Sequence, residues 1–118
     1  MAQVLLVDDA AFMRLRCARL LQEEGHEVLE AANGREAVEV YQTHRPDAVL
    51  MDITMPEMDG LEALRAIRAI DPQARVAMLT AMGQQAIVIE AIKCGARDFV
   101  VKPFERERVL AAVAKLIG

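Results

Sequence analysis

Residues 48–52 read Ala48-Val49-Leu50-Met51-Asp52, four apolar residues in direct succession that run into a carboxylate. A second run, Val4-Leu5-Leu6-Val7, is built in the same way and is followed by Asp8-Asp9. Continuous apolar runs of this length are typical of strands that are buried on both faces, as the strands of parallel sheets are. The two runs therefore predict a parallel sheet that is covered on both faces, with acidic residues at the ends of these two strands.

On both sides of these runs, short β-rich segments alternate with longer segments of helical periodicity. This alternation predicts right-handed crossovers and one doubly wound α/β domain, (βα)5, over residues 1–118. No linker or low-complexity segment divides the sequence. We expect strands at residues 3–7, 28–32, 48–51, 76–79 and 99–101, and helices at residues 11–24, 34–44, 61–70, 84–94 and 106–117.

The composition is that of a globular, mildly acidic chain. Hydrophobic residues make up 54% of the 118 residues, charged residues make up 27%, and the net charge is −4. This balance argues against direct binding to nucleic acid. No apolar run approaches the ~20 residues of a membrane span, and the amino-terminal segment lacks the basic start and cleavage site of a signal peptide. We expect a cytoplasmic monomer without membrane insertion.

Several residues are expected to be structural. Cys17 and Cys94 lack the spacing of a metal site or a redox motif. We expect Cys17 to lie in the core and Cys94 to lie at the end of a helix. The arginines of the first helix, Arg14, Arg16 and Arg19, are expected to form a solvated face.

Polar residues stand at the ends of four of the five expected strands. Asp8 and Asp9 follow the first strand, and Asp52 follows the third. Thr80 and Lys102 follow the fourth and the fifth. Because the ligand crevice of an open parallel sheet lies beyond the carboxyl ends of its strands, we expect these side chains to meet at one rim.

The residue types at this rim indicate phosphoryl chemistry. Clustered carboxylates without His or Cys favour a hard cation, and a small number of protein ligands favours Mg²⁺. A hard cation, an ammonium and a hydroxyl together suit a phosphoryl group. Asp52 stands alone on its strand and is predicted to accept the phosphoryl group as an acyl phosphate. Asp8 and Asp9 form a pair that is suited to the metal.

Four segments of the sequence resemble the motifs of response regulator receiver domains. They are Val7-Asp8-Asp9, residues 51–60, Thr80-Ala81 and residues 99–104, and the resemblance covers essentially the whole chain. It implies a flavodoxin-like fold with strand order 2-1-3-4-5. Residues 8–14 and 81–85 are most similar to the stand-alone chemotaxis regulators of the family.

The resemblance implies a role for each acidic residue. Asp52 is expected to receive a phosphoryl group from a sensor histidine kinase of the CheA type. Asp9, Asp52 and the backbone carbonyl of Thr54 are expected to hold Mg²⁺, while Asp8 acts largely through bound water.

The resemblance also implies how the signal is passed on. Lys102 and Thr80 are expected to contact the phosphoryl oxygens. Phe99 takes the place of the aromatic switch residue, whose ring turns inward when Thr80 moves. The Lys102–Pro103 peptide bond is expected to be cis.

The helix at residues 84–94 carries more apolar residues than one buried stripe can hold. Exposed apolar residues often mark a partner site, and the resemblance implies an output face here. We hypothesise that Ile87 or Val88 contacts the target, for which a flagellar motor switch protein or a phosphatase is a candidate. Thr54 and Met82 offer no carboxylate or carboxamide to orient water, so slow loss of the phosphoryl group is expected.

Other interpretations stay open from the residues alone. A Mg²⁺-dependent phosphohydrolase would use Asp52 through the same intermediate, although Thr54 stands where a second acid would be needed. A flavodoxin-like cofactor binder is disfavoured because Asp8-Asp9 would repel a phosphate. The chain could also be a receiver removed from a larger regulator.

Overall fold

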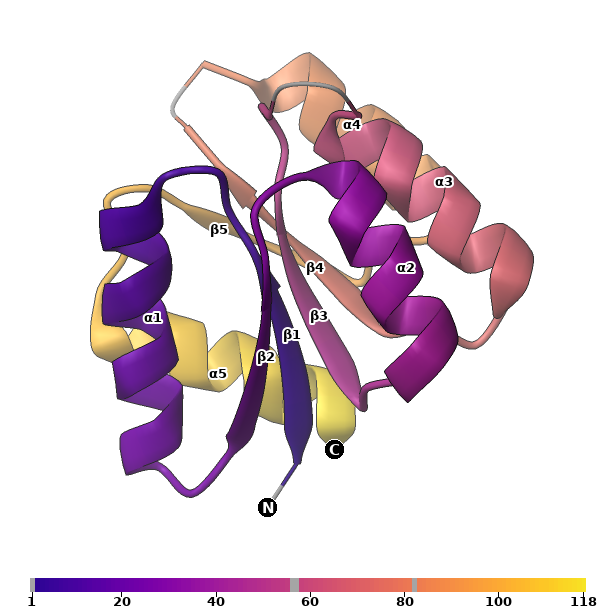
Figure 1. Cartoon of the computed structure of the whole chain (residues 1–118). Coiled ribbons are helices and arrows are strands. Elements are labelled where there is room, and N and C mark those ends of the chain that lie inside the picture. Colours follow the sequence, from indigo (N-terminus) through magenta and orange to yellow (C-terminus); the bar gives the residue numbers. More distant parts are fainter. Residues whose placement is uncertain (1, 56–57, 82) are drawn as a thin grey trace.

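The computed structural model describes residues 2–55, 58–81 and 83–118, which form a five-stranded parallel sheet of order β2-β1-β3-β4-β5. This is the strand order that the resemblance to receiver domains implied. Figure 1 shows the sheet in the middle of the molecule, with helices on both of its faces. The strands are β1 (Gln3–Val7), β2 (Glu27–Ala31), β3 (Ala48–Asp52), β4 (Val76–Thr80) and β5 (Asp98–Val101).

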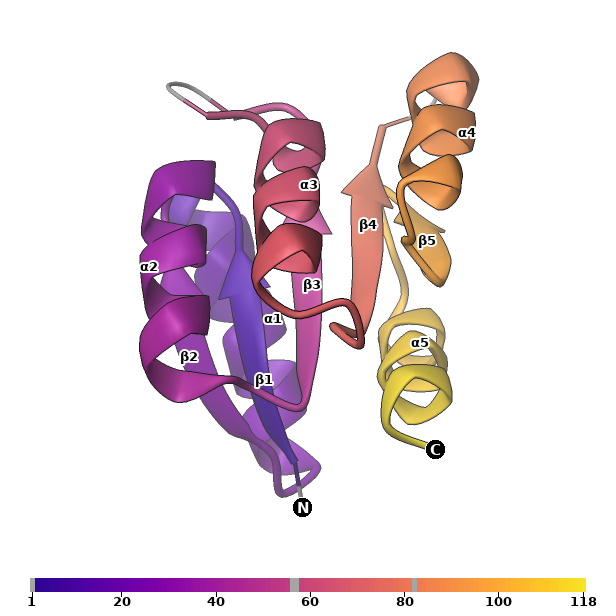
Figure 2. The same cartoon turned by 90° about the vertical axis from the view of Figure 1, so that its right-hand side faces the viewer.

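The helices follow the strands one by one along the chain. In Figures 1 and 2, α1 and α5 cover one face of the sheet, and α2, α3 and α4 cover the other. The helices therefore change face between α1 and α2 and change back between α4 and α5, so both faces are covered, as in a doubly wound fold. The helices are α1 (Ala11–Glu23), α2 (Gly34–His44), α3 (Gly60–Ile70), α4 (Gln85–Lys93) and α5 (Arg106–Ile117).

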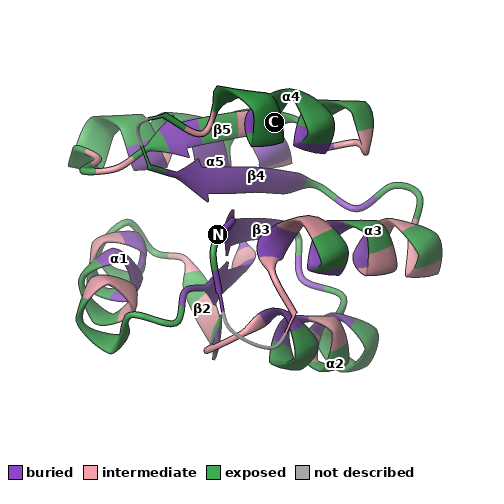
Figure 3. Cartoon of the chain, turned by 90° about the horizontal axis from the view of Figure 1, so that it is seen from above, coloured by how far each residue is buried: buried purple, intermediate pink, exposed green. Residues whose placement is uncertain are grey.

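The core consists of two apolar layers, one on each face of the sheet. Successive side chains of a strand point to opposite faces, and in β1 Leu5 packs into one layer while Leu6 packs into the other. All residues of β3 and β4 are buried, which Figure 3 shows in purple. The strands are apolar without alternation because both of their faces are covered, as the sequence indicated.

The predicted elements are all present, and their ends differ from the predicted ones by at most one residue. Asp52 and Thr80 are the last residues of β3 and β4, whereas we had placed them just beyond these strands. Their backbones are held by the sheet, so the start of each side chain is fixed by strand pairing. Two polar groups of the rim, Asp52 and Thr80, are thus placed by the sheet itself.

Helix α4 corrects one prediction. Val88 is only 9% exposed and packs in the core layer of α2 and α3, so its placement on a partner surface is wrong. Helical spacing puts Val88 and Ala91 on the buried stripe. Ile87 is exposed, as proposed, and so are Ile89 and Ile92.

The two cysteines lie as predicted. Cys17 is buried, and burial raises the pKa of its thiol to about 12. Cys94 is half-buried at the carboxyl end of α4. Within the described ranges, no helix has both the length and the apolar character that a membrane crossing needs.

Candidate functional site

The carboxyl ends of β1 and β3 lie side by side and carry the acidic residues of the site. Asp8 is 2% exposed and Asp52 is 8% exposed, whereas the side chain of Asp9 is open to solvent. Oxygens of the three carboxylates lie within 4.8 Å of one another. The structure therefore brings together the acidic residues that the sequence placed at separate strand ends.

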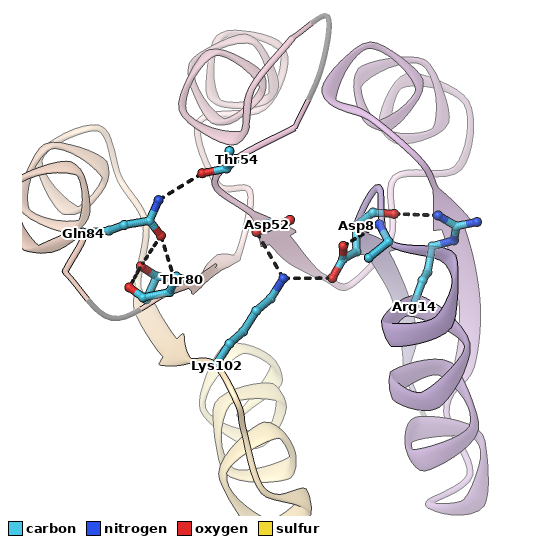
Figure 4. A network of polar contacts seen from close by, with 9 residues as sticks. Asp8, Arg14, Asp52, Thr54, Thr80, Gln84 and Lys102 are labelled. Atoms are coloured by element: carbon cyan, nitrogen blue, oxygen red, sulfur yellow. Dashed lines mark hydrogen bonds and ion pairs between the residues drawn. The ribbon is translucent and has the colours of Figure 1, made fainter.

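Lys102 joins two of these carboxylates. Its Nζ lies 3.1 Å from Asp8 Oδ2 and 3.3 Å from Asp52 Oδ1, and Figure 4 shows the ammonium between the two groups. The Lys102 backbone N–H donates to the Thr80 carbonyl oxygen at 2.7 Å, which continues the pairing of β4 with β5. This bond places the lysine side chain at the rim, where it offsets part of the negative charge.

The loop after β1 is held by bonds that the sequence did not indicate. Asp8 Oδ1 accepts from the Ala10 N–H at 2.9 Å. The Arg14 guanidinium donates to the Asp8 carbonyl oxygen and pairs with Glu30 of β2 at 3.0 Å. The prediction of a purely solvated Arg14 is therefore wrong, since this side chain fastens the acidic loop to the neighbouring strand.

The loop after β3 is fixed by the close approach of α3. The Gly60 N–H donates to the Ile53 carbonyl oxygen at 2.8 Å, and the Asp59 carboxylate caps α3 by accepting from the Glu62 N–H at 2.9 Å. A Cβ on Gly60 would lie 2.1 Å from the Asp52 carbonyl oxygen. Only glycine allows the helix to start this close to the acidic residue.

Burial and neighbouring charges shift the pKa values of Asp52 and Lys102. Burial, with a smaller contribution from Asp8, raises the pKa of Asp52 to about 6 although Lys102 opposes the change. Burial acts to lower the pKa of Lys102, but the carboxylates of Asp52 and Asp8 outweigh it and the pKa is raised. Without a further cation, the site therefore holds more negative charge than one ammonium can stabilise.

The donor set fits a hard divalent cation. Asp8, Asp9 and Asp52 supply only carboxylate oxygens, and the exposed Asp9 leaves one side open to water. Oxygen ligands with retained water are the preference of Mg²⁺. A divalent ion would also offset the carboxylate charge that Lys102 leaves uncompensated.

Thr80 lies beside this centre and is tied to a residue that the sequence reasoning missed. The Thr80 hydroxyl is 2.9 Å from Gln84 Oε1 and 3.0 Å from the Ala81 carbonyl oxygen. Gln84 Nε2 in turn donates to the Thr54 hydroxyl at 2.9 Å (Figure 4). The sequence signal for Gln84 is its position: it is a carboxamide at the start of a predicted helix, only four residues after Thr80, and therefore near the same rim.

An apolar pocket of about 510 Å³ adjoins Thr80 between α4 and β5. Phe99 and Val101 line it from β5, and Ile89 and Ile92 line it from α4. Phe99 is 38% exposed, so its ring is not enclosed in the core. The Lys102–Pro103 bond is cis, as predicted. Met82, which we expected to line the approach to the site, lies outside the described residues.

Fold and site together define a flavodoxin-like domain with an acidic crevice that a lysine bridges. Residues 4–114 match the model of the response regulator receiver domain family, and the chain belongs to that family. The expectation from the sequence motifs is thereby confirmed. Family membership favours the receiver interpretation over the phosphohydrolase alternative.

Known relatives include several chemotaxis proteins. The chain is 57% identical to the chemotaxis protein CheY of Bacillus subtilis over 98% of each chain. It is 56% identical to CheY of Thermotoga maritima, over 97% of this chain and 96% of that protein. The structure superposes with a TM-score of 0.92 on a CheX–CheY–BeF3–Mg complex of Borrelia burgdorferi, at 39% identity and covering 98% of this chain and 89% of that one.

Proposed function

We propose that the protein is a receiver that accepts a phosphoryl group on Asp52 from a sensor histidine kinase and thereby changes its affinity for a partner. The observation that carries this proposal is the position of Lys102, whose ammonium contacts both Asp8 and Asp52 at the crevice. An ammonium held 3.3 Å from the acceptor carboxylate is close enough to contact a phosphoryl oxygen added there.

The transfer needs a nucleophile and charge stabilisation. A carboxylate oxygen of Asp52 forms an O–P bond while the N–P bond of a phosphohistidine breaks. The donor nitrogen leaves with the bonding electrons and takes up a proton. Asp52 must be ionised to attack, and Lys102 favours that form. The chain thus assists its own phosphorylation without being a turnover enzyme.

Mg²⁺ is the cation that we assign to the carboxylate cluster. Asp9, Asp52 and the backbone carbonyl of Thr54 would hold it, with Asp8 acting through water. When bound, the ion neutralises charge that develops on the phosphoryl oxygens. The mention of Mg²⁺ in the related complex from Borrelia burgdorferi supports this choice.

Phosphorylation would change the surface formed by β4, β5 and the helix α4 between them, and a partner would recognise this change. Thr80 would donate to a phosphoryl oxygen, and Phe99 would turn into the space that this movement opens. The exposed Ile87 is proposed to contact the target beside the apolar pocket. Such a switch needs only a few kcal/mol of difference between two states.

The cellular setting follows from the chemotaxis proteins to which the chain is similar. We propose a cytoplasmic signalling role in chemotaxis, with a CheA-like kinase as the phosphoryl donor. A flagellar motor switch protein or a phosphatase would be the partner of the phosphorylated form. The net charge of −4 gives no support to a direct nucleic-acid partner.

The test is phosphorylation of the chain by acetyl phosphate in the presence of Mg²⁺, followed by intact-protein mass spectrometry. The wild type is expected to gain one phosphoryl group, and Asp52→Asn is expected to gain none because an amide oxygen is a poor nucleophile. Asp47→Asn is the matched control, since Asp47 is exposed and contacts the Gln3 N–H far from the site. Equal labelling of Asp52→Asn and the wild type would overturn the proposal.

A further inference from the structure

Gln84 is placed as a helix cap but does not act as one. It is the residue before α4, and its side chain makes no capping hydrogen bond to that helix. Its carboxamide instead turns toward the strand ends. Oε1 accepts from the Ala81 N–H at 2.7 Å and from the Thr80 hydroxyl at 2.9 Å, while Nε2 donates to the Thr54 hydroxyl at 2.9 Å.

This one side chain connects three parts of the rim. Thr54 belongs to the loop after β3, Thr80 ends β4, and Gln84 precedes α4. Figure 4 shows the carboxamide between the two threonines, on the side of Thr80 that faces away from Lys102. Three hydrogen bonds from a half-buried glutamine fix the orientation of its amide, so the oxygen faces Thr80 and the nitrogen faces Thr54.

The bonds restrict what Thr80 can do. A threonine hydroxyl has a single proton to donate, and both acceptors in reach, Gln84 Oε1 and the Ala81 carbonyl, lie on the α4 side. Among the described residues, no hydrogen bond links the Thr80 hydroxyl to the side chain of Asp52 or Lys102. A donation to a group on Asp52 therefore requires the hydroxyl to leave Gln84.

We propose that the Gln84 carboxamide is a latch that holds Thr80 in the unphosphorylated arrangement and sets how readily the switch occurs. The inference rests on the proposed function, because it concerns the equilibrium between the two states of a receiver. When Thr80 turns toward a phosphoryl oxygen, Gln84 loses one of its partners. The latch thus opposes activation, and its strength is a property of this side chain and of its anchor on Thr54.

The experiment is a titration with beryllofluoride and Mg²⁺, followed by the amide signals of Thr80 and Ala81 in NMR spectra. Beryllofluoride serves as the phosphoryl probe. Gln84→Ala is expected to bind it about 3- to 10-fold more tightly than the wild type, which is the range that one net hydrogen bond allows. Gln85→Ala is the matched control and is expected to bind like the wild type, since Gln85 is exposed at the next position.

A second readout separates a latch from a merely structural contact. Without ligand, the Thr80 and Ala81 signals of Gln84→Ala should move toward their positions in the beryllofluoride-bound wild type. Thr54→Ala removes only the anchor of the latch and keeps the backbone carbonyl. It is expected to show a smaller shift in the same direction, and it tests the proposal even where Gln84→Ala folds poorly.

Unchanged or weaker binding by both Gln84→Ala and Thr54→Ala would overturn the latch. If the wild type binds beryllofluoride and Asp52→Asn does not, such a result leaves the receiver function in place. If the wild type and Asp52→Asn behave alike, the proposed function fails as well. The two failures are therefore distinguishable in one set of titrations.

Discussion

Asp52 carries an electrostatic conflict. Folding buries this carboxylate beside Asp8, and the ammonium of Lys102 is shared between the two acids. A buried charge that is incompletely paired destabilises the native state. The arrangement costs stability, but it keeps the Asp52 carboxylate, a nucleophile, next to the Lys102 ammonium in a partly dry crevice.

The conflict predicts a pH dependence of stability in metal-free buffer with a chelator. The pKa of Asp52 is raised from 3.8 to about 6 in the folded protein. Between these values the native state binds more protons than the unfolded state, so stability falls as the pH rises through this window and stays lower above it. Asp52→Asn, which does not titrate, should be more stable than the wild type by about 1–3 kcal/mol at pH 7.5.

Urea unfolding at pH 7.5 and pH 4 measures this difference, which should largely vanish at the lower pH because Asp52 is then protonated. Asp47→Asn serves as the control and should show no such pH-dependent gain. An equal stability of Asp52→Asn and the wild type at both pH values would contradict the assignment.

The sequence predicted most of the site and missed its supporting contacts for a physical reason. Asp8, Asp52 and Lys102 were found because strand ends in a parallel sheet necessarily meet at one edge. Gln84 stands just before α4 and Arg14 stands on α1, where a long flexible side chain has several directions open to it. Their partners depend on tertiary distances that no local pattern encodes.

Among the elements, α4 shows how a helix divides its apolar residues between the core and the surface. The apolar excess in its sequence correctly indicated exposed residues, but it did not say which ones. Val88 belongs to the core and Ile87 does not. The difference depends on which side of the helix packs on the sheet, a tertiary property that a largely apolar segment leaves undetermined.

This division predicts different costs for two neighbouring substitutions. Val88→Ala opens space in the core layer and should lower the free energy of unfolding by about 1–3 kcal/mol. Ile87→Ala removes an exposed side chain and should change it by less than about 0.5 kcal/mol. Chemical denaturation of the two variants checks the prediction, and equal losses would show that the burial of α4 is misassigned.

For the molecule as a whole, a cation bound at the proposed site would link folding to cation binding. Its carboxylates come from β1 and β3 and converge only when the sheet has formed. A ligand that binds only the folded state stabilises it by mass action, by about 2.7 kcal/mol at a hundredfold excess over its dissociation constant. Mg²⁺ should therefore raise the melting temperature of the wild type by several degrees relative to a chelator.

Calorimetric melting curves with increasing Mg²⁺ measure this effect. Asp9→Asn should need more Mg²⁺ for the same rise, because it removes one ligand without disturbing the buried pair. A melting temperature that does not depend on Mg²⁺ would rule out the proposed cation site.

Lys102 and Asp8 are separated by 94 positions in the sequence, yet their side chains meet. On the ribosome, Asp8 and Asp52 emerge well before Lys102, the lysine that pairs with both, since β5 is the last of the described strands to be made. A partly synthesised chain therefore presents the two carboxylates without their ammonium. The charge of these two carboxylates is offset by Lys102 only after the final strand has joined the sheet.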